Sequence, residues 1–297
     1  MITVENLTKS YGDRRAVDSL SFTVRPGRVT GFVGPNGSGK STTMRMMVGL
    51  THPDTGRVLY NGAAYGELER PVTTIGAALD ASAHPGRTAR NHLRTMCAAS
   101  GLRSSRVDEV LAEVGITTVA DQRVGGFSLG MRQRLALAGA LLGEPETLLL
   151  DEPANGLDPD GIRWLRSYLR GYAERGGAVF VSSHLIAELA LFADDLVVIG
   201  AGRLLAAAPV DEVVNDAERS VLIETPQRDE LIALLRGQGI GVSEVGHRIN
   251  VIGASRSDVA QLALDHHIRL DELVDHQASL EDLLVELTQT AAEFTAA

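Results

Sequence analysis

Apolar and polar residues alternate along two stretches near the N-terminus, 2–11 (ITVENLTKSY) and 19–27 (SLSFTVRPG). This pattern is typical of strands with one solvated face, so we predict antiparallel strands here. The next stretch, 28–34 (RVTGFVG), has the character of a buried strand that leads into a glycine loop. Residues 39–50 (GKSTTMRMMVGL) are predicted to form the helix after that loop.

Two further short apolar runs, 146–153 (ETLLLDEP) and 177–184 (GAVFVSSH), are each followed by a helical pattern, at 160–176 and 185–193. Strands that alternate with helices predict a parallel α/β sheet whose ligand lies beyond the carboxyl ends of the strands. The region from about 91 to 143 has helical patterns only, and we predict a helical insertion outside the sheet.

The pattern changes after residue 210. We interpret the rest as strand, helix, strand, strand, helix, strand and helix, which predicts a small ferredoxin-like accessory domain at 211–297. The expected segments are 220–225, 228–239, 242–247, 248–253, 257–267, 268–276 and 279–290.

Charge supports the same division. The chain has 297 residues and a net charge of −10, from 28 basic and 38 acidic residues, and 17 of the acidic residues lie in 211–297. An acidic tail argues against a nucleic-acid surface, which needs clustered Lys and Arg.

Apolar stretches such as 135–143 are far shorter than the ~18 residues of a membrane-spanning helix, and the N-terminal sequence has no signal-peptide core. We therefore expect a cytoplasmic protein that reaches a membrane only through a partner. The single Cys97 excludes an internal disulfide.

Residues 34–42 (GPNGSGKST) have the spacing of a phosphate loop, with Gly34, Gly39, Lys40 and Ser41 at its fixed positions. In such loops the lysine contacts the β and γ phosphate oxygens, and the serine hydroxyl binds Mg²⁺. The alternative is a chance glycine turn before a helix. The strand predicted before the loop and the helix predicted after it argue against this alternative.

Asp151 and Glu152 end one predicted strand, and His184 ends another. We expect Asp151 to hold Mg²⁺, Glu152 to act as general base on the attacking water, and His184 to contact the γ-phosphate. Taken alone, such an acidic pair is more often part of a helix N-terminus, but its place on a strand about a hundred residues downstream of a phosphate loop favours the catalytic interpretation.

A second turn opens a helix at 127–142 (FSLGMRQRLALAGALL), and a helix N-terminus of this kind suits an anion. With this motif, four motifs stand in order: GPNGSGKST, FSLGMRQR, LLLDEPANGLDP and SSH. Over about residues 1–210 the chain resembles the ATP-binding subunits of ABC transporters. The similarity is greatest to bacterial drug and peptide-antibiotic exporters of the bacitracin-resistance kind.

The resemblance implies an α/β fold, the P-loop NTPase cassette with a RecA-like core, an antiparallel β subdomain and a helical subdomain at about 91–143. A small α+β domain would follow it. ATP and Mg²⁺ would be the cofactors, with Glu152, His184 and Lys40 catalytic, and Ser41, Asp151 and Asp80 around the metal. The nucleotide would be held by Tyr11, which stacks on adenine, and by Gly34, Pro35, Asn36, Gly37, Ser38, Gly39, Lys40, Ser41 and Thr42. For Tyr11, the alternative is a plain strand-face tyrosine.

The resemblance also implies a head-to-tail homodimer, in which Ser128 and Gly130 contact the γ-phosphate on the partner's loop and Asp158 lies at the dimer seam. Leu129 and Met131 replace the commonest Gly and Gln of the signature, a variant that the export branch shares. Asp80 stands where most members have a glutamine that touches Mg²⁺ or water. Its side chain is shorter, so a loop-capping carboxylate is the alternative.

These features predict an ATPase that powers export of a drug or antibiotic-like substrate through separate membrane-spanning subunits. Alternatives are a soluble cassette ATPase that acts on ribosomes or DNA, and an importer ATPase. The first usually has two cassettes or a long coiled-coil insertion, which this chain lacks. The export-like signature and Asp80 disfavour the second.

Overall fold

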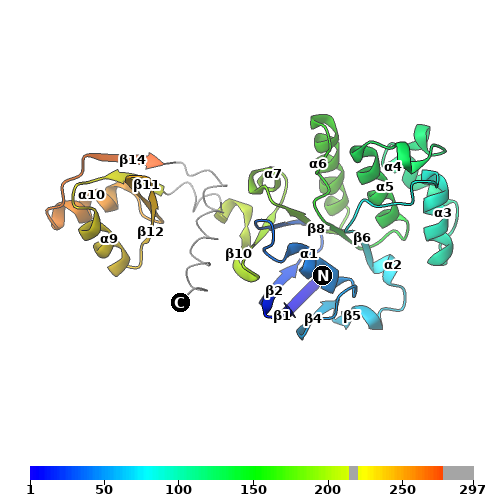
Figure 1. Cartoon of the computed structure of the whole chain (residues 1–297), viewed down its shortest axis with the longest axis horizontal. Helices are drawn as coiled ribbons and strands as arrows, with labels where there is room; N and C mark the ends of the chain where they lie inside the picture. Colours follow the sequence, from blue (N-terminus) through cyan, green and yellow to red (C-terminus); the bar gives the residue numbers. More distant parts are fainter. Residues whose placement is uncertain (214–219, 277–297) are drawn as a thin grey trace. The chain divides into compact units, whose positions relative to one another are not determined.

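The computed structural model describes residues 1–213 and 220–276. The chain divides into two compact units, Met1–Ala207 and Ala208–Ala297, and each is described by itself (Figure 1). In the described residues, no helix combines the length and apolar character needed to cross a membrane.

The first unit contains an antiparallel sheet with the strand order β2-β1-β4-β5. Its strands are β1 (Ile2–Tyr11), β2 (Arg14–Val24), β4 (Thr55–Tyr60) and β5 (Ala63–Ala64). The pairing of β1 with β2 confirms the antiparallel strands expected from the alternating pattern. Strands β4 and β5 were not expected from the sequence.

A six-stranded sheet follows in the order β10-β9-β3-β8-β7-β6. Its strands are β3 (Val29–Val33), β6 (Ile75–Ala78), β7 (Thr147–Leu150), β8 (Ala178–Ser183), β9 (Asp195–Gly200) and β10 (Arg203–Pro209). The neighbours from β6 to β9 pair in parallel, which confirms the parallel sheet expected from the runs that form β3, β7 and β8, although β6, β9 and β10 were not expected from the sequence. The carboxyl ends of β3, β7 and β8 therefore meet at one edge of the sheet.

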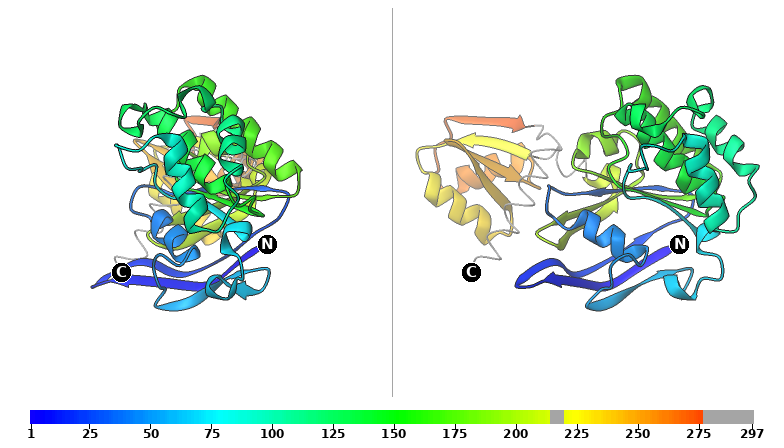
Figure 2. Two further views of the ribbon diagram at one scale, coloured as in Figure 1. Left: turned by 90° about the vertical axis from the view of Figure 1, so that its right-hand side faces the viewer. Right: turned by 45° about the vertical axis from the view of Figure 1, so that its right-hand side comes forward.

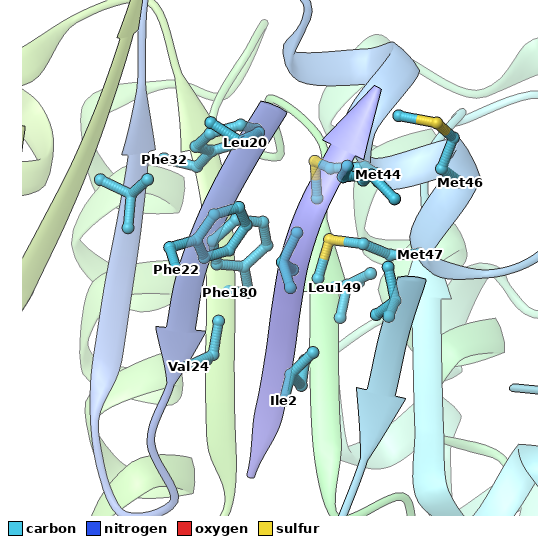
Figure 3. Close-up of a cluster of buried hydrophobic side chains, with 14 of the residues drawn as sticks. Ile2, Leu20, Phe22, Val24, Phe32, Met44, Met46, Met47, Leu149 and Phe180 are labelled. Carbon is cyan, nitrogen blue, oxygen red and sulfur yellow. The ribbon is translucent and has the colours of Figure 1, made fainter. Parts of the chain in front are cut away.

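The main core lies between these two sheets and around α1 (Lys40–Met47) (Figures 2 and 3). Phe180 on β8 packs against Phe32 at 4.9 Å and against Phe22 at 5.4 Å between ring centroids. Met44 and Met47 are fully buried on the inner side of α1. This packing fixes α1 directly after β3, so the loop between them has a rigid frame on both sides.

Helices α6 (Pro159–Glu174) and α7 (Ile186–Ala190) contact β3 and β8. The short elements 65–67 and α2 (Pro71–Thr74) precede β6. The predicted helical insertion contains α3 (Ala89–Ala99), α4 (Arg106–Glu113) and α5 (Leu129–Leu141), with 3-10 turns at 117–119 and 124–126. It begins slightly before the expected residue 91, because Thr88 caps α3 by accepting a hydrogen bond from the Asn91 N–H.

The second unit has the described elements β11 (Ser220–Glu224), α9 (Arg228–Gly237), β12 (Gly241–Val245), β13 (Arg248–Ile252), α10 (Arg256–Asp265) and β14 (Glu272–His276). Its sheet has the order β12-β13-β11-β14 and is antiparallel throughout. This is the topology of a split βαβ fold, so the ferredoxin-like prediction is confirmed for these elements. The last expected helix, 279–290, lies outside the described residues.

Candidate active site

The phosphate loop joins β3 to α1 and requires glycine at two of its positions. Gly39 has a φ of 107°, and a Cβ there would lie 2.5 Å from the Ala16 carbonyl oxygen. A Cβ on Gly34 would lie 2.5 Å from the Ile199 carbonyl oxygen. The backbone therefore passes its neighbours too closely for a side chain, and the loop keeps a tight, wrapped conformation.

Lys40 is 6% exposed and lies folded back over the loop. Its Nζ donates to the Gly34 carbonyl oxygen at 2.5 Å and lies 3.6 Å from Glu152 Oε1. Burial lowers the pKa of Lys40, while the nearby carboxylates of Glu152 and Asp151 partly oppose that effect. A phosphate group in the loop would offer this cation better acceptors than a neutral carbonyl.

Asp151 and Glu152 follow β7 and are held by residues at the end of β8. Ser182 Oγ donates to Asp151 Oδ1 at 2.5 Å and accepts from the Glu152 N–H at 2.8 Å. His184 Nδ1 lies 2.9 Å from Glu152 Oε2. Glu152 has a φ of 48°, a left-handed backbone conformation that is uncommon outside glycine.

A cavity of about 390 Å³ opens over this edge of the sheet. It is lined by most of the phosphate loop, by Glu152, and by Tyr11 and Arg14 at the β1–β2 turn. Tyr11 is 54% exposed, and Lys9 Nζ lies over its ring at 5.7 Å from the centroid. The cavity therefore joins an aromatic ring at one side to a phosphate loop and a carboxylate at the other.

Two residues at this site were missed by the sequence analysis. Arg14 lines the cavity, and its Nη2 donates to the Gly37 carbonyl oxygen at 3.4 Å. Its signal was a basic pair three residues after Tyr11. Ser182 belongs to the SSH motif, but the sequence alone assigned it no role, because that role depends on the pairing of β7 with β8.

A larger cavity, of about 640 Å³, lies at the amino-terminal ends of β7 and β8. It contains none of the motif residues, and its Arg106 is paired with Glu144 at 3.3 Å. The cavity of about 390 Å³, which the motif residues line, is therefore the candidate active site.

Ser41 and Asp151 are a donor set that fits Mg²⁺. Magnesium is usually bound by one or two protein oxygens together with water and substrate phosphates, and a hydroxyl and a carboxylate match that preference. Ser41 lines the cavity, and Asp151 Oδ2 accepts no hydrogen bond from the described residues, whereas Oδ1 accepts from Ser182.

Asp80, by contrast, does not line the cavity over the phosphate loop. It follows β6, is exposed, and its Oδ1 accepts from the Ser82 N–H at 3.0 Å. It lines a separate cavity of about 270 Å³ with Arg132 and Leu135 of α5. This local turn is the geometry of the loop-capping alternative.

Ser128, Gly130 and Asp158 also do not line the cavity of their own chain. Ser128 caps α5 by accepting from the Met131 N–H at 3.2 Å, and Asp158 caps α6 by accepting from the Gly161 N–H at 2.7 Å. Leu129 packs so closely on Gly156 that a Cβ there would lie 2.0 Å from Leu129 Cδ2. The signature turn therefore rests on the loop that precedes α6.

A parallel sheet with a phosphate loop, a buried lysine and a carboxylate held by histidine defines a P-loop nucleotide-hydrolysing enzyme. Residues 17–155 match the family described as ABC transporter. Residues 219–281 match a second family, described as Domain of unknown function (DUF8746).

Relatives are similar over nearly the whole chain. The uncharacterized ABC transporter ATP-binding protein YhcH of Bacillus subtilis is 36% identical over 99% of this chain and 97% of its own length. The bacitracin transport ATP-binding protein BcrA of Bacillus licheniformis is 33% identical over 97% of each chain. A solved dimeric ATP-binding cassette in a post-hydrolysis state, bound to ADP and Pi, superimposes with a TM-score of 0.65 at 23% identity, over 71% of this chain and 99% of that one.

The chain belongs to the ATP-binding subunits of ABC transporters. It is an ATPase, and it has the cassette fold that the resemblance implied.

Proposed function

We propose that this ATPase powers export of a peptide-antibiotic or drug-like substrate through separate membrane-spanning subunits. The observation that carries the catalytic part is the position of Glu152, whose two carboxylate oxygens face Lys40 and His184. Relatives named for bacitracin and lantibiotic transport support the substrate class. No feature of the described residues favours the ribosome, DNA or importer alternatives.

In this proposal ATP lies with its adenine on Tyr11 and its phosphates in the loop 34–42. Lys40 exchanges the Gly34 carbonyl for phosphate oxygens, and Glu152 accepts a proton from the attacking water. His184 holds Glu152 in place and contacts the γ-phosphate. Mg²⁺, held by Ser41 and Asp151, would neutralise part of the charge that develops on the phosphates.

The proposed active form is a head-to-tail homodimer. Ser128 and Gly130 open α5, where the first backbone N–H groups have no partner within the helix and favour an anion. Since these residues do not line their own chain's cavity, a phosphate on the partner's loop is their proposed ligand. Asp158, at the start of α6, would lie at the seam.

Mixed dimers test this arrangement. Lys40→Ala and Ser128→Arg should each abolish hydrolysis alone, because every site in a homodimer then has one defect. In a head-to-tail heterodimer both defects fall in one site and the other site is intact, so mixing the two variants should restore activity. No restoration, with heterodimers confirmed by affinity tags, would show that Ser128 acts within its own chain.

Export is tested with the membrane subunits present. Co-purification with a membrane-spanning partner, and antibiotic tolerance that is lost in Lys40→Ala cells, are the expected results. The proposed location is the cytoplasmic face of the membrane, reached through that partner. Unchanged antibiotic tolerance in Lys40→Ala cells would contradict the proposed export role. It would not contradict the conclusion that the protein is an ATPase.

We also propose that residues 1–210 form the ATP-binding cassette and 211–297 an accessory domain without catalytic residues. The separate cores of the two units support this division. A chain that ends after Val210 should fold and bind Mg-ATP with nearly full affinity. Loss of cooperative unfolding in this truncated chain would mean that the two parts depend on one core.

A further inference from the structure

We propose that Ser182 is a positioning residue for the hydrolytic reaction, because its single hydroxyl sets both the proposed metal ligand Asp151 and the peptide of the proposed base Glu152. This inference rests on the proposed function of these two carboxylates. The hydroxyl oxygen lies 2.5 Å from Asp151 Oδ1 and 2.8 Å from the Glu152 backbone nitrogen.

Strand pairing explains why these groups meet. In the parallel pair β7–β8, Leu150 is opposite Val181, so the next residues along each strand, Asp151 and Ser182, are neighbours at the carboxyl edge. Ser182 also pairs with Phe32 of β3, two residues before Gly34 and the phosphate loop. Ser182 is 1% exposed, so its hydroxyl is shielded from solvent.

The direction of both hydrogen bonds follows from the atoms. A serine hydroxyl has one proton to donate, and a backbone N–H can only donate. Since the Glu152 N–H must point to Ser182 Oγ, the Ser182 proton must point to Asp151 Oδ1. That bond occupies one carboxylate oxygen and leaves Oδ2 for a metal ion.

The second bond acts on the base. Glu152 has a φ of 48°, which a non-glycine residue keeps only where its surroundings hold it. The contact with Ser182 satisfies the Glu152 N–H in that conformation. The side chain can then extend between Lys40 and His184, at 3.6 Å and 2.9 Å.

The test compares two variants of nearly equal volume, Ser182→Thr and Ser182→Val, which differ in whether the hydroxyl is kept. Nucleotide affinity is measured by fluorescence of a labelled ATP, first with EDTA and then with Mg²⁺, and ATP turnover is measured on the full chain. Thr30→Val is the matched control, because Thr30 is buried on the neighbouring strand β3 and its hydroxyl has no hydrogen-bond partner among the described residues.

For Ser182→Val we expect affinity in EDTA to stay within about twofold of wild type. The gain in affinity on adding Mg²⁺ should fall about tenfold, and kcat should fall at least about tenfold, the range for losing a hydrogen bond to a charged group. Ser182→Thr and Thr30→Val should retain the Mg²⁺ effect and turnover. If Ser182→Val does not fold, Ser182→Ala is used in its place.

Two results would overturn the proposal: an unchanged Mg²⁺ effect and kcat in the variant without a hydroxyl, or an equal loss of affinity in EDTA and in Mg²⁺. The second would mean that Ser182 only supports the fold near the loop. Failure of the proposed function of the two carboxylates would appear differently, as normal turnover in Glu152→Gln and a normal Mg²⁺ effect in Asp151→Asn.

Discussion

His184 Nδ1 lies 2.9 Å from Glu152 Oε2, although the two residues are 32 positions apart in the sequence. The contact connects the ends of β8 and β7, and Lys40 lies 3.6 Å from the other carboxylate oxygen. Glu152 is thus held on both sides, by a cation that belongs to the phosphate loop and by an imidazole. These contacts position the carboxylate that we propose as the general base before the nucleotide binds.

Glu152→Gln should therefore bind Mg-ATP with nearly wild-type affinity and lose turnover by ~10² or more, the range for removing a general base. The amide preserves the shape of the side chain but accepts no proton. Single-turnover hydrolysis and equilibrium binding separate the two effects. Glu174→Gln, at the exposed end of α6, is the control and should hydrolyse ATP normally.

Glu152→Gln should also accumulate a long-lived ATP-bound dimer, because the ATP bound between the two subunits is not hydrolysed. Size-exclusion chromatography with Mg-ATP measures it. A purely monomeric profile at saturating Mg-ATP would contradict the composite site.

The lowered pKa of Lys40 predicts proton uptake when ATP binds at alkaline pH. In the free protein, burial makes Lys40 lose its proton below the ordinary lysine value of about 10.4, and phosphate oxygens favour the charged form. Affinity for ATP should therefore fall as the pH rises from the lowered pKa of Lys40 in the free protein toward the ordinary lysine pKa. Titration calorimetry in buffers of different ionisation enthalpy measures the uptake.

Lys40 has an opposite effect on the stability of the free protein. Since its folded pKa is lowered, the unfolded chain binds more protons in the same window, and stability rises with pH there. Lys40→Met should remove both this slope and the proton uptake. Proton uptake that persists in Lys40→Met would assign it to another group.

Arg14 should contribute to phosphate binding. It lines the nucleotide cavity beside the loop, and no ion pair with an acidic residue is seen for it among the described residues. Arg14→Ala should weaken the binding of ATP and of ADP by about tenfold, which is the contribution of one charge-assisted hydrogen bond. The affinity for adenosine should not change. Arg15→Ala is the matched control, because Arg15 is paired with Asp18 at 2.9 Å and does not line the cavity. Equal effects of the two substitutions would indicate a general charge effect only.

Motifs of contiguous residues were predictable from the sequence, because their chemistry requires fixed neighbours. The phosphate loop, Asp151 with Glu152, and the strands before them belong to this class. Strand β6 was missed because Ile75–Ala78 (IGAA) consists mostly of small residues without a strand pattern. The role of Ser182 was missed because it depends on which residue of β7 faces it, and one sequence does not give that register.

Asp80 is the residue that we expect to couple the ATPase to the membrane subunit. The residue is exposed, and it lies in a different cavity from the nucleotide, with its Oδ1 bonded to the Ser82 N–H at 3.0 Å. Asp80→Ala should leave ATP affinity nearly unchanged, because the loop and Asp151 provide the proposed contacts to nucleotide and metal. If the residue senses the membrane subunit, the loss falls on substrate exported per ATP hydrolysed, which is a coupling free energy between two sites. Vesicles that contain the full transporter allow both rates to be measured together.

Asp80→Asn is the informative control, because its amide oxygen can still accept a hydrogen bond from the Ser82 N–H while the charge is removed. If export per ATP falls equally in Asp80→Ala and Asp80→Asn, the coupling depends on the charge. If Asp80→Ala exports as much substrate per ATP as wild type, the prediction is wrong, and the Asp80 carboxylate only caps its own loop.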